Sequence, residues 1–240
     1  MQAGAYARFR PAYPEALFTW LAQQVPVRQL AWDCATGNGQ AALGLAAHFA
    51  QVVASDASPE QIIRSRAHPQ IRYLVANAEV PPAEAQGADL VTVAQALHWF
   101  NFERFYPALK RTLKPDGLFA AWGYGLMRVT PDVDAVVQDY YQNVVGSYWP
   151  PERHHIETGY REIPFPLTEL LCPSFVMQTE WSLETLLGYL ETWSATRLYR
   201  QAREGAHPVE SLRTRFAHAW GEAPTRAVSW PLFLRAGRFA

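Results

Sequence analysis

The sequence predicts an α/β fold: a doubly wound, mostly parallel sheet of seven strands whose C-terminal strand is antiparallel. Three observations support this prediction. Short apolar, β-branched segments alternate with helical patterns through the first half of the chain, which is typical of βαβ units. The crossovers of such units are right-handed, so their helices cover both faces of a sheet. The last third then shows a strand pattern, a long helix and a terminal strand pattern, which fits an antiparallel edge.

The first half supplies five of the strands and three helices. We expect the strands at residues 29–34, 51–55, 71–75, 90–94 and 118–122. We expect the helices at residues 39–48, 59–66 and 102–113. The segment Lys114-Pro115-Asp116-Gly117 has the composition of a turn, which would end the third helix and lead into the fifth strand.

The second half has a different composition. Residues 125–173 are rich in proline and aromatic side chains, with one helix expected near 133–144. The remaining elements are expected as a strand at 174–181, helices at 183–202 and 209–220, and a strand at 227–235. We therefore predict a single domain over residues 1–240, in which 125–173 is an insertion that forms a lid over the active site.

Composition limits the classes of partner. The 240 residues are 49% hydrophobic and 18% charged, with a formal net charge of -1, so no strong field attracts nucleic acid or an anionic membrane. The two cysteines, Cys34 and Cys172, form no metal-spaced pair and favour a reducing compartment, which we take to be the cytoplasm. No segment approaches the ~18 apolar residues of a membrane span. We expect a small-molecule partner and no metal; a monomer and a dimer both stay open.

A glycine-containing turn follows the first strand. Asp33 lies near the end of the strand, and Gly37 and Gly39 lie in the turn that leads into the next helix. Open α/β sheets bind ligands at this position. The glycines permit a sharp turn and a close approach of the ligand to the backbone. Asp56 ends the second strand, where a carboxylate can accept hydrogen bonds from both hydroxyls of a ribose; capping of the next helix is the alternative role for this residue.

Two nucleoside ligands fit these glycines. Gly37-x-Gly39-x-x-Ala42 also satisfies the fingerprint of dinucleotide binding, so an NAD(P)-dependent oxidoreductase is one alternative. Asp33 favours S-adenosylmethionine, because a carboxylate repels a pyrophosphate and attracts the cationic sulfonium and ammonium of that cofactor. The structural alternative is that Asp33 only caps the turn.

The same residues resemble motif I of the class I S-adenosylmethionine-dependent methyltransferases, Asp/Glu-x-Gly-x-Gly-x-Gly, with Ala35 in place of the first glycine. Ser55-Asp56-Ala57-Ser58 resembles the second motif, and Asn77-Ala78-Glu79 stands where the family often has Asp-Ala. The resemblance covers about Tyr6 to Tyr124 and implies a Rossmann-like methyltransferase fold. It implies that residue 77 meets the adenine amino group and that the Ala78 N–H meets a ring nitrogen. The implied cofactor-binding residues are Asp33, Ala35, Gly37, Gly39, Asp56, Ala57, Asn77, Ala78 and Gln95.

Three further segments resemble the branch that contains the ubiquinone-biosynthesis and trans-aconitate methyltransferases. They are residues 10–14, 94–99 and 189–194. The branch implies transfer of a methyl group to a small molecule. The nucleic-acid methyltransferases that act on base amino groups carry Asp/Asn-Pro-Pro-aromatic after the fourth strand, whereas this chain has Ala94-Gln95-Ala96-Leu97. A catalytically silent cofactor-binding module is a further alternative, because a fold does not fix a function.

Two side chains are candidates for the chemistry itself. His98 follows the fourth strand and could act as a general base on an acceptor hydroxyl, or it could pack against the cofactor. Arg10 could clamp a carboxylate bidentately, or it could pack on Tyr13. Arg197 and Arg200 are weaker clamp candidates. A carboxylate acceptor would need no base.

Overall fold

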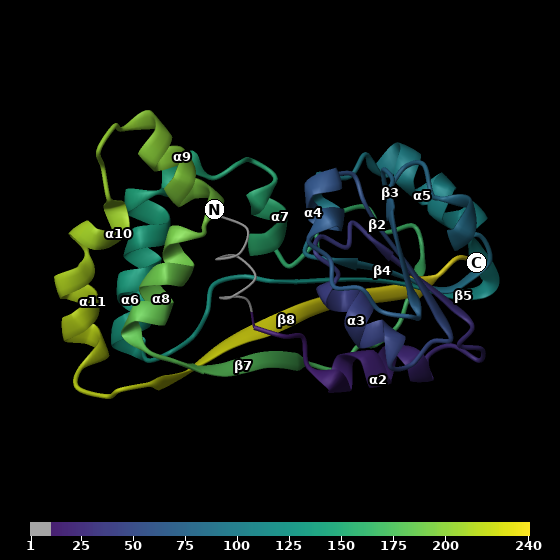
Figure 1. The fold of residues 1–240 in the computed structure, drawn as a ribbon, viewed down its shortest axis with the longest axis horizontal. Coiled ribbons are helices and arrows are strands. Elements are labelled where there is room, and N and C mark those ends of the chain that lie inside the picture. Colours follow the sequence, from purple (N-terminus) through teal and green to yellow (C-terminus); the bar gives the residue numbers. More distant parts are fainter. Residues whose placement is uncertain (1–10) are drawn as a thin grey trace. The chain divides into compact units, whose positions relative to one another are not determined.

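The computed structural model of the chain describes residues 11–240. Arg10, the predicted carboxylate clamp, lies outside these residues. The described chain forms two compact units (Figure 1), and each is considered by itself. We call Ala12–Gly125, His154–Phe175 and Leu232–Ala240 the sheet unit, and we call Leu126–Arg153 and Val176–Pro231 the helical unit.

The strands follow the order β3-β2-β1-β4-β5-β8-β6, and β7 pairs with β8. Their bounds are β1 Leu30–Cys34, β2 Gln51–Asp56, β3 Ile71–Val75, β4 Ala88–Ala94, β5 Leu113–Tyr124, β6 Thr168–Glu169, β7 Phe175–Trp181 and β8 Arg226–Arg238. β1 to β5 pair in parallel, and β8 runs antiparallel to β5. This arrangement confirms the predicted doubly wound, mostly parallel fold. The sheet has eight strands where seven were expected, because the two-residue β6 is too short to leave a periodic pattern.

Helices cover both faces of the parallel strands, as Figure 1 shows. The helices of the sheet unit are α2 Glu15–Gln23, α3 Gln40–Ala46, α4 Pro59–Ile63, α5 Phe102–Thr112 and most of α7 Arg153–Glu157. Phe119 and Trp122 lie three positions apart on β5 and therefore point to opposite faces. The Phe119 ring packs 5.7 Å from Phe105 of α5, and the Trp122 ring packs 6.3 Å from Phe18 of α2. The predicted helices at 39–48, 59–66 and 102–113 thus occur as α3, α4 and α5.

The predicted turn at Lys114–Gly117 is wrong. These residues belong to β5 and form an irregularity in its pairing with β4: Ala88 pairs with Leu113, but Leu90 pairs with Leu118. The four residues 114–117 therefore face the single residue Asp89. The Lys114 Nζ lies 2.6 Å from the Asp89 Oδ1, and this ion pair holds the extra residues against the neighbouring strand.

The predicted insertion 125–173 is divided between the two units, since 126–153 lies in the helical unit and 154–173 in the sheet unit. The second part contributes to the core of the sheet unit: Ile156, Tyr160, Ile163 and Leu167 are buried in the same cluster as residues of α5 and β5. The idea of a lid therefore concerns residues 126–153, for which it stays a prediction. Whether 1–240 acts as a single domain also stays a prediction.

The helical unit contains α6 Pro131–Asp139, α8 Leu183–Glu191, α9 Ser194–Ala202, α10 Pro208–Ser211 and α11 Arg213–Trp220. The single helix expected at 183–202 is two helices, because Trp193 adopts an extended conformation between α8 and α9. The Trp193 ring packs 5.8 Å from Tyr140 and 5.5 Å from Trp149, and Trp181 packs 4.9 Å from Trp230. These tryptophans fill the core of the unit.

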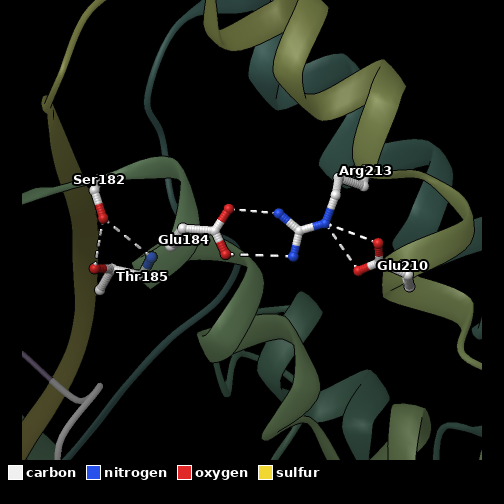
Figure 2. Close-up of polar contacts among 5 residues, drawn as sticks. All are labelled: Ser182, Glu184, Thr185, Glu210 and Arg213. Carbon is white, nitrogen blue, oxygen red and sulfur yellow. Dashed lines mark hydrogen bonds and ion pairs between the residues drawn. The ribbon is translucent and has the colours of Figure 1, made fainter.

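Exposed ion pairs join three helices of the helical unit. Figure 2 shows Arg213 between Glu184 of α8 and Glu210 of α10. Ser182 is the N-cap of α8: its hydroxyl oxygen accepts a hydrogen bond from the Thr185 N–H at 3.3 Å. Within residues 11–240, every helix is too short or too polar to cross a bilayer.

Candidate active site

The loop after β1 has a left-handed backbone at alternate positions. Ala35, Gly37 and Gly39 have φ angles of 56°, 59° and 89°. A Cβ on Gly37 would meet nothing within 4 Å, whereas a Cβ on Gly39 would lie 2.8 Å from the Tyr73 Cε1. Gly37 is therefore required for its backbone conformation and leaves open space beside it. Gly39 is required for both its conformation and its contact with Tyr73.

Ala35 takes a conformation that disfavours any side chain. A left-handed φ costs a non-glycine residue roughly 1–2 kcal/mol. The family motif has glycine at this position. Ala35 replaces that glycine and therefore adopts a strained backbone conformation. The hydrogen bond from the Thr36 N–H to the Ser55 carbonyl, at 2.9 Å, holds the loop immediately after Ala35.

Asp33 lies under this loop and is fully buried. Its Oδ2 accepts a hydrogen bond from the Thr36 hydroxyl, and its Oδ1 accepts one from the Thr92 hydroxyl at 2.8 Å. Burial raises the pKa of Asp33 to about 6, although these hydrogen bonds oppose the rise. The carboxylate is still mostly ionised at neutral pH. Because the residue is fully buried, it could influence a ligand only through its charge and through the loop that it holds, and its role in cofactor binding stays a prediction.

Asp56 connects the end of β2 to the same loop. Its Oδ2 accepts the Gly37 N–H at 2.9 Å, and its Oδ1 accepts the Ser58 N–H at 2.8 Å. The N-terminus of α4 has no side-chain cap, and the Ser58 N–H that Asp56 accepts precedes the helix, so Asp56 orders the turn before α4 without capping the helix itself. Each carboxylate oxygen retains a second lone pair for a ligand hydroxyl, so the two roles are compatible.

Three more of the predicted cofactor-binding residues follow the ends of β2 and β3: Ala57, Asn77 and Ala78. Asp56 is paired with Val75, so Ala57 and Asn77 follow the carboxyl ends of neighbouring parallel strands. Both are exposed, whereas Ala78 is buried. The Ala76 N–H donates to the Asp56 carbonyl at 3.0 Å, which keeps the chain ordered beyond β3.

Gln95 follows the last residue of β4 with a left-handed φ of 57°. Its Nε2 donates to the Tyr124 carbonyl and its Oε1 accepts the Tyr124 N–H, both at 3.0 Å. The side chain therefore extends the pairing of β4 with β5 by one step. A direct contact of Gln95 with a cofactor stays a prediction.

His98 lies in a short turn after β4 and is only 8% exposed. Its Nδ1 lies 3.0 Å from the hydroxyl of Tyr160, which is fully buried. The sequence did not indicate this pair, because 62 positions separate the two residues. The general expectation that a buried imidazole needs a hydrogen-bond partner was the one available signal.

The two weaker clamp candidates belong to α9. The Arg200 Nη1 lies 3.3 Å from a carboxylate oxygen of Glu191. Arg197 is an exposed residue of α9. Among residues 11–240, no three His, Cys, Asp or Glu side chains gather in a way that could hold a metal ion.

Comparison with known proteins identifies the family. A methyltransferase domain matches residues 32–121. A candidate methyltransferase of Dictyostelium discoideum is 33% identical over 237 residues, covering 96% of this chain and 90% of the relative. An uncharacterised methyltransferase of Mycobacterium tuberculosis is 37% identical over 115 residues, which are 48% of this chain and 46% of the relative.

A solved structure supports the same conclusion. A candidate type II methyltransferase from Anaeromyxobacter dehalogenans superposes with a TM-score of 0.87 and 45% identity, covering 95% of this chain and 97% of that one. The similarity to this structure and to the Dictyostelium protein extends over nearly the whole chain. The chain belongs to the class I S-adenosylmethionine-dependent methyltransferases.

Proposed function

We propose that the chain transfers a methyl group from S-adenosylmethionine to a small-molecule acceptor. The loop over Asp33 carries this proposal. It combines open space beside Gly37 with a buried carboxylate and an anchored backbone. A buried negative charge suits a cationic ligand and disfavours a diphosphate, so the loop fits the sulfonium cofactor better than a dinucleotide.

The residues around the loop fit the remaining parts of the cofactor. Asp56 would hold the ribose hydroxyls, and Asn77 with the Ala78 N–H would hold the adenine edge. Large apolar side chains are exposed in the segments that follow β2 and end β3: Ile63 is 82% exposed, Val75 55% and Val80 68%. Val75 and Val80 lie within three residues of Asn77 in the sequence, so the flat face of an adenine held by Asn77 would cover apolar side chains beside it.

When bound, the cofactor supplies a methyl group already activated on positively charged sulfur. The protein is left to orient the acceptor and exclude water. Gln95 joins the ends of β4 and β5, and His98 follows three positions later, so we place the acceptor near these strand ends. Transfer to a small metabolite in the cytoplasm, as in the branch named above, is the working proposal.

Thermal stability measured with each ligand tests the proposal. S-adenosylmethionine and S-adenosylhomocysteine should raise the Tm, because a ligand that binds only the folded state stabilises it. NAD should not. Stabilisation by NAD alone would refute the proposal. Binding of S-adenosylmethionine with no formation of S-adenosylhomocysteine, whichever acceptor pool is added, would favour the silent module.

A substitution at the ribose site sharpens this test. Asp56→Ala should weaken binding of S-adenosylhomocysteine by about 1–3 kcal/mol, the range for removing a hydrogen-bond partner from a buried polar group. Asp116→Ala, a change at an exposed carboxylate of β5, is the matched control and should leave the calorimetric affinity unchanged. Equal affinity of both variants would remove Asp56 from the cofactor site.

A further inference from the structure

Thr92 of β4 reaches the buried carboxylate of Asp33 from the neighbouring strand. The two residues are paired in the parallel register of β1 and β4, so their side chains leave the sheet on the same face. The Thr92 hydroxyl donates to the Asp33 Oδ1 at 2.8 Å, and both residues are fully buried. Thr92 therefore contacts the carboxylate from outside the glycine-containing loop.

Neutral donors surround the Asp33 carboxylate. The Thr36 hydroxyl donates to its Oδ2 and the Thr92 hydroxyl to its Oδ1, and the backbone of Ala42 also hydrogen-bonds to it. An ionised carboxylate only accepts hydrogen bonds, whereas a protonated one must place a proton on one of its oxygens. Each of these donors therefore favours the charged form.

The other titratable groups that face Asp33 do not stabilise its charge. Asp56 of β2 carries a like charge, which raises the pKa of Asp33. Burial raises the pKa of the Cys34 thiol and of the Tyr73 phenol, and the charge of Asp33 raises both further, so the two groups are neutral at pH 7. Among the described residues, the charge of Asp33 is therefore supported by its hydrogen bonds alone.

The margin that keeps Asp33 charged is narrow. Burial raises its pKa to about 6, so neutral pH lies only about one pH unit higher. A hydrogen bond to a charged group shifts a pKa by about one to two pH units. Loss of the Thr92 hydroxyl would therefore bring the pKa of Asp33 into the neutral range or above it, and about half or more of the carboxyl groups would be protonated at pH 7.

We infer that Thr92 is a positioning residue that holds the Asp33 carboxylate in its charged form, and that this charge lets the site distinguish S-adenosylmethionine from its product S-adenosylhomocysteine. The inference rests on the proposed function. It gives β4 a part in cofactor recognition through a residue that lies beneath the site.

The two ligands differ in charge at one atom. S-adenosylmethionine has a positive sulfonium, and transfer of its methyl group leaves the bonding electron pair on sulfur as a neutral thioether. The product is otherwise the same molecule. A buried negative charge favours the sulfonium over the thioether, because a charge shielded from water acts over a longer distance than an exposed one. Protonation of Asp33 removes this preference.

The charge on Asp33 is measurable without a ligand. In protein labelled with ¹³C-aspartate, NMR gives the titration midpoint of each carboxyl group, and Asp33→Asn identifies the signal. Thr92→Val keeps the shape of the side chain and removes the hydroxyl, so it should raise the Asp33 midpoint by about one to two pH units. Thr92→Ser keeps the hydroxyl and should leave the midpoint close to its original value. An unchanged midpoint in Thr92→Val would overturn the inference.

Calorimetric affinities for both ligands test the discrimination. If S-adenosylmethionine requires the charged form, its apparent affinity falls in proportion to the fraction of that form. Thr92→Val should weaken it by about two- to tenfold at pH 7 and should weaken S-adenosylhomocysteine by less than about twofold. The difference should shrink near about pH 9, and Thr92→Ser should restore the ratio of the two affinities. Each comparison is made at one pH, so titration of the ligand cancels.

The outcomes separate the inference from the proposed function. Equal loss of both affinities in Thr92→Val, at every pH, would show a structural disturbance and overturn the inference alone. An unsubstituted protein that binds neither ligand would refute the proposed function, and the discrimination would fall with it. Thr92→Ala removes the same hydroxyl with a smaller side chain, and it provides the same measurements if Thr92→Val does not fold.

Discussion

Replacing Asp33 by Asn should stabilise the protein at neutral pH while weakening its hold on a cationic cofactor. Burial moves the pKa of Asp33 from 3.8 to about 6. At about 1.36 kcal/mol per unit, the ionised carboxylate costs about 3 kcal/mol of folding stability above pH 6. Asn carries no such cost, but one of the two threonine hydroxyls must reverse its hydrogen bond, at a cost of about 1 kcal/mol. The net gain should be about 1–2 kcal/mol.

The sign of the pH dependence follows from the raised pKa. Between pH 4 and 6 the folded protein binds more protons at Asp33 than the unfolded chain does, so this residue lowers stability as the pH rises through that interval. The advantage of Asp33→Asn should therefore grow from about pH 4 to about pH 6 and then level off. Urea unfolding of both proteins across this range measures it, because other titrating groups cancel in the difference.

The same substitution should weaken S-adenosylmethionine binding by about 2 kcal/mol, the interaction of unit charges ~8 Å apart at an effective dielectric constant of ~20. In the unsubstituted protein the affinity should also fall as the pH drops below about 6, and in Asp33→Asn it should not. Calorimetry between about pH 5 and about pH 8 gives both values. A variant that is less stable at every pH and binds the cofactor normally would refute the role assigned to the buried charge.

Three smaller predictions concern backbone strain and surface charge. Ala35→Gly should relieve its left-handed strain and, after the greater entropy of an unfolded glycine, raise stability by about 0.5–1 kcal/mol in urea unfolding; a loss would show that the Ala35 methyl packs favourably. Gly39→Ala should cost more stability than Gly37→Ala, because only the former meets Tyr73, and equal costs would contradict this. Arg213→Ala should lower the Tm slightly at low salt and hardly at all near ~1 M salt, where charges are screened within ~3 Å; a loss of Tm that is independent of salt would show that its ion pairs are not the cause.

Local pattern was sufficient for the parallel half of the fold. The strands β1 to β4 begin and end within two residues of their predicted bounds, because buried parallel strands are continuous apolar segments. The prediction failed at residues 114–117, whose composition is compatible with either a turn or an irregular strand. Lys114 to Gly117 has turn composition, yet these residues are held along β4 by the contact of Lys114 with Asp89. Nothing in the local sequence specifies that pairing.

The break between α8 and α9 has a similar origin. The sequence on both sides of Trp193 is compatible with one continuous helix, and the residue itself favours no break. The break instead depends on packing, since the Trp193 ring contacts Tyr140, Tyr141, Trp149 and Tyr189 in the core of the helical unit. Contacts with residues far away in the sequence can override a helical pattern, whose intrinsic preference is weak.

The candidate site shows the same division between local and distant information. The glycines, Asp33 and Asp56 were recognisable because their spacing is set by one strand, one turn and one helix. Thr92 and Tyr160 were not, because each reaches its partner across the sheet unit, at sequence separations of 59 and 62. The Thr92 hydrogen bond lowers the pKa of Asp33, against the effect of burial, and Tyr160 contacts the imidazole of His98. The sequence can therefore indicate which groups are candidates for the site, but the charge state of a buried carboxylate and the hydrogen bonds of a buried imidazole depend on the folded structure.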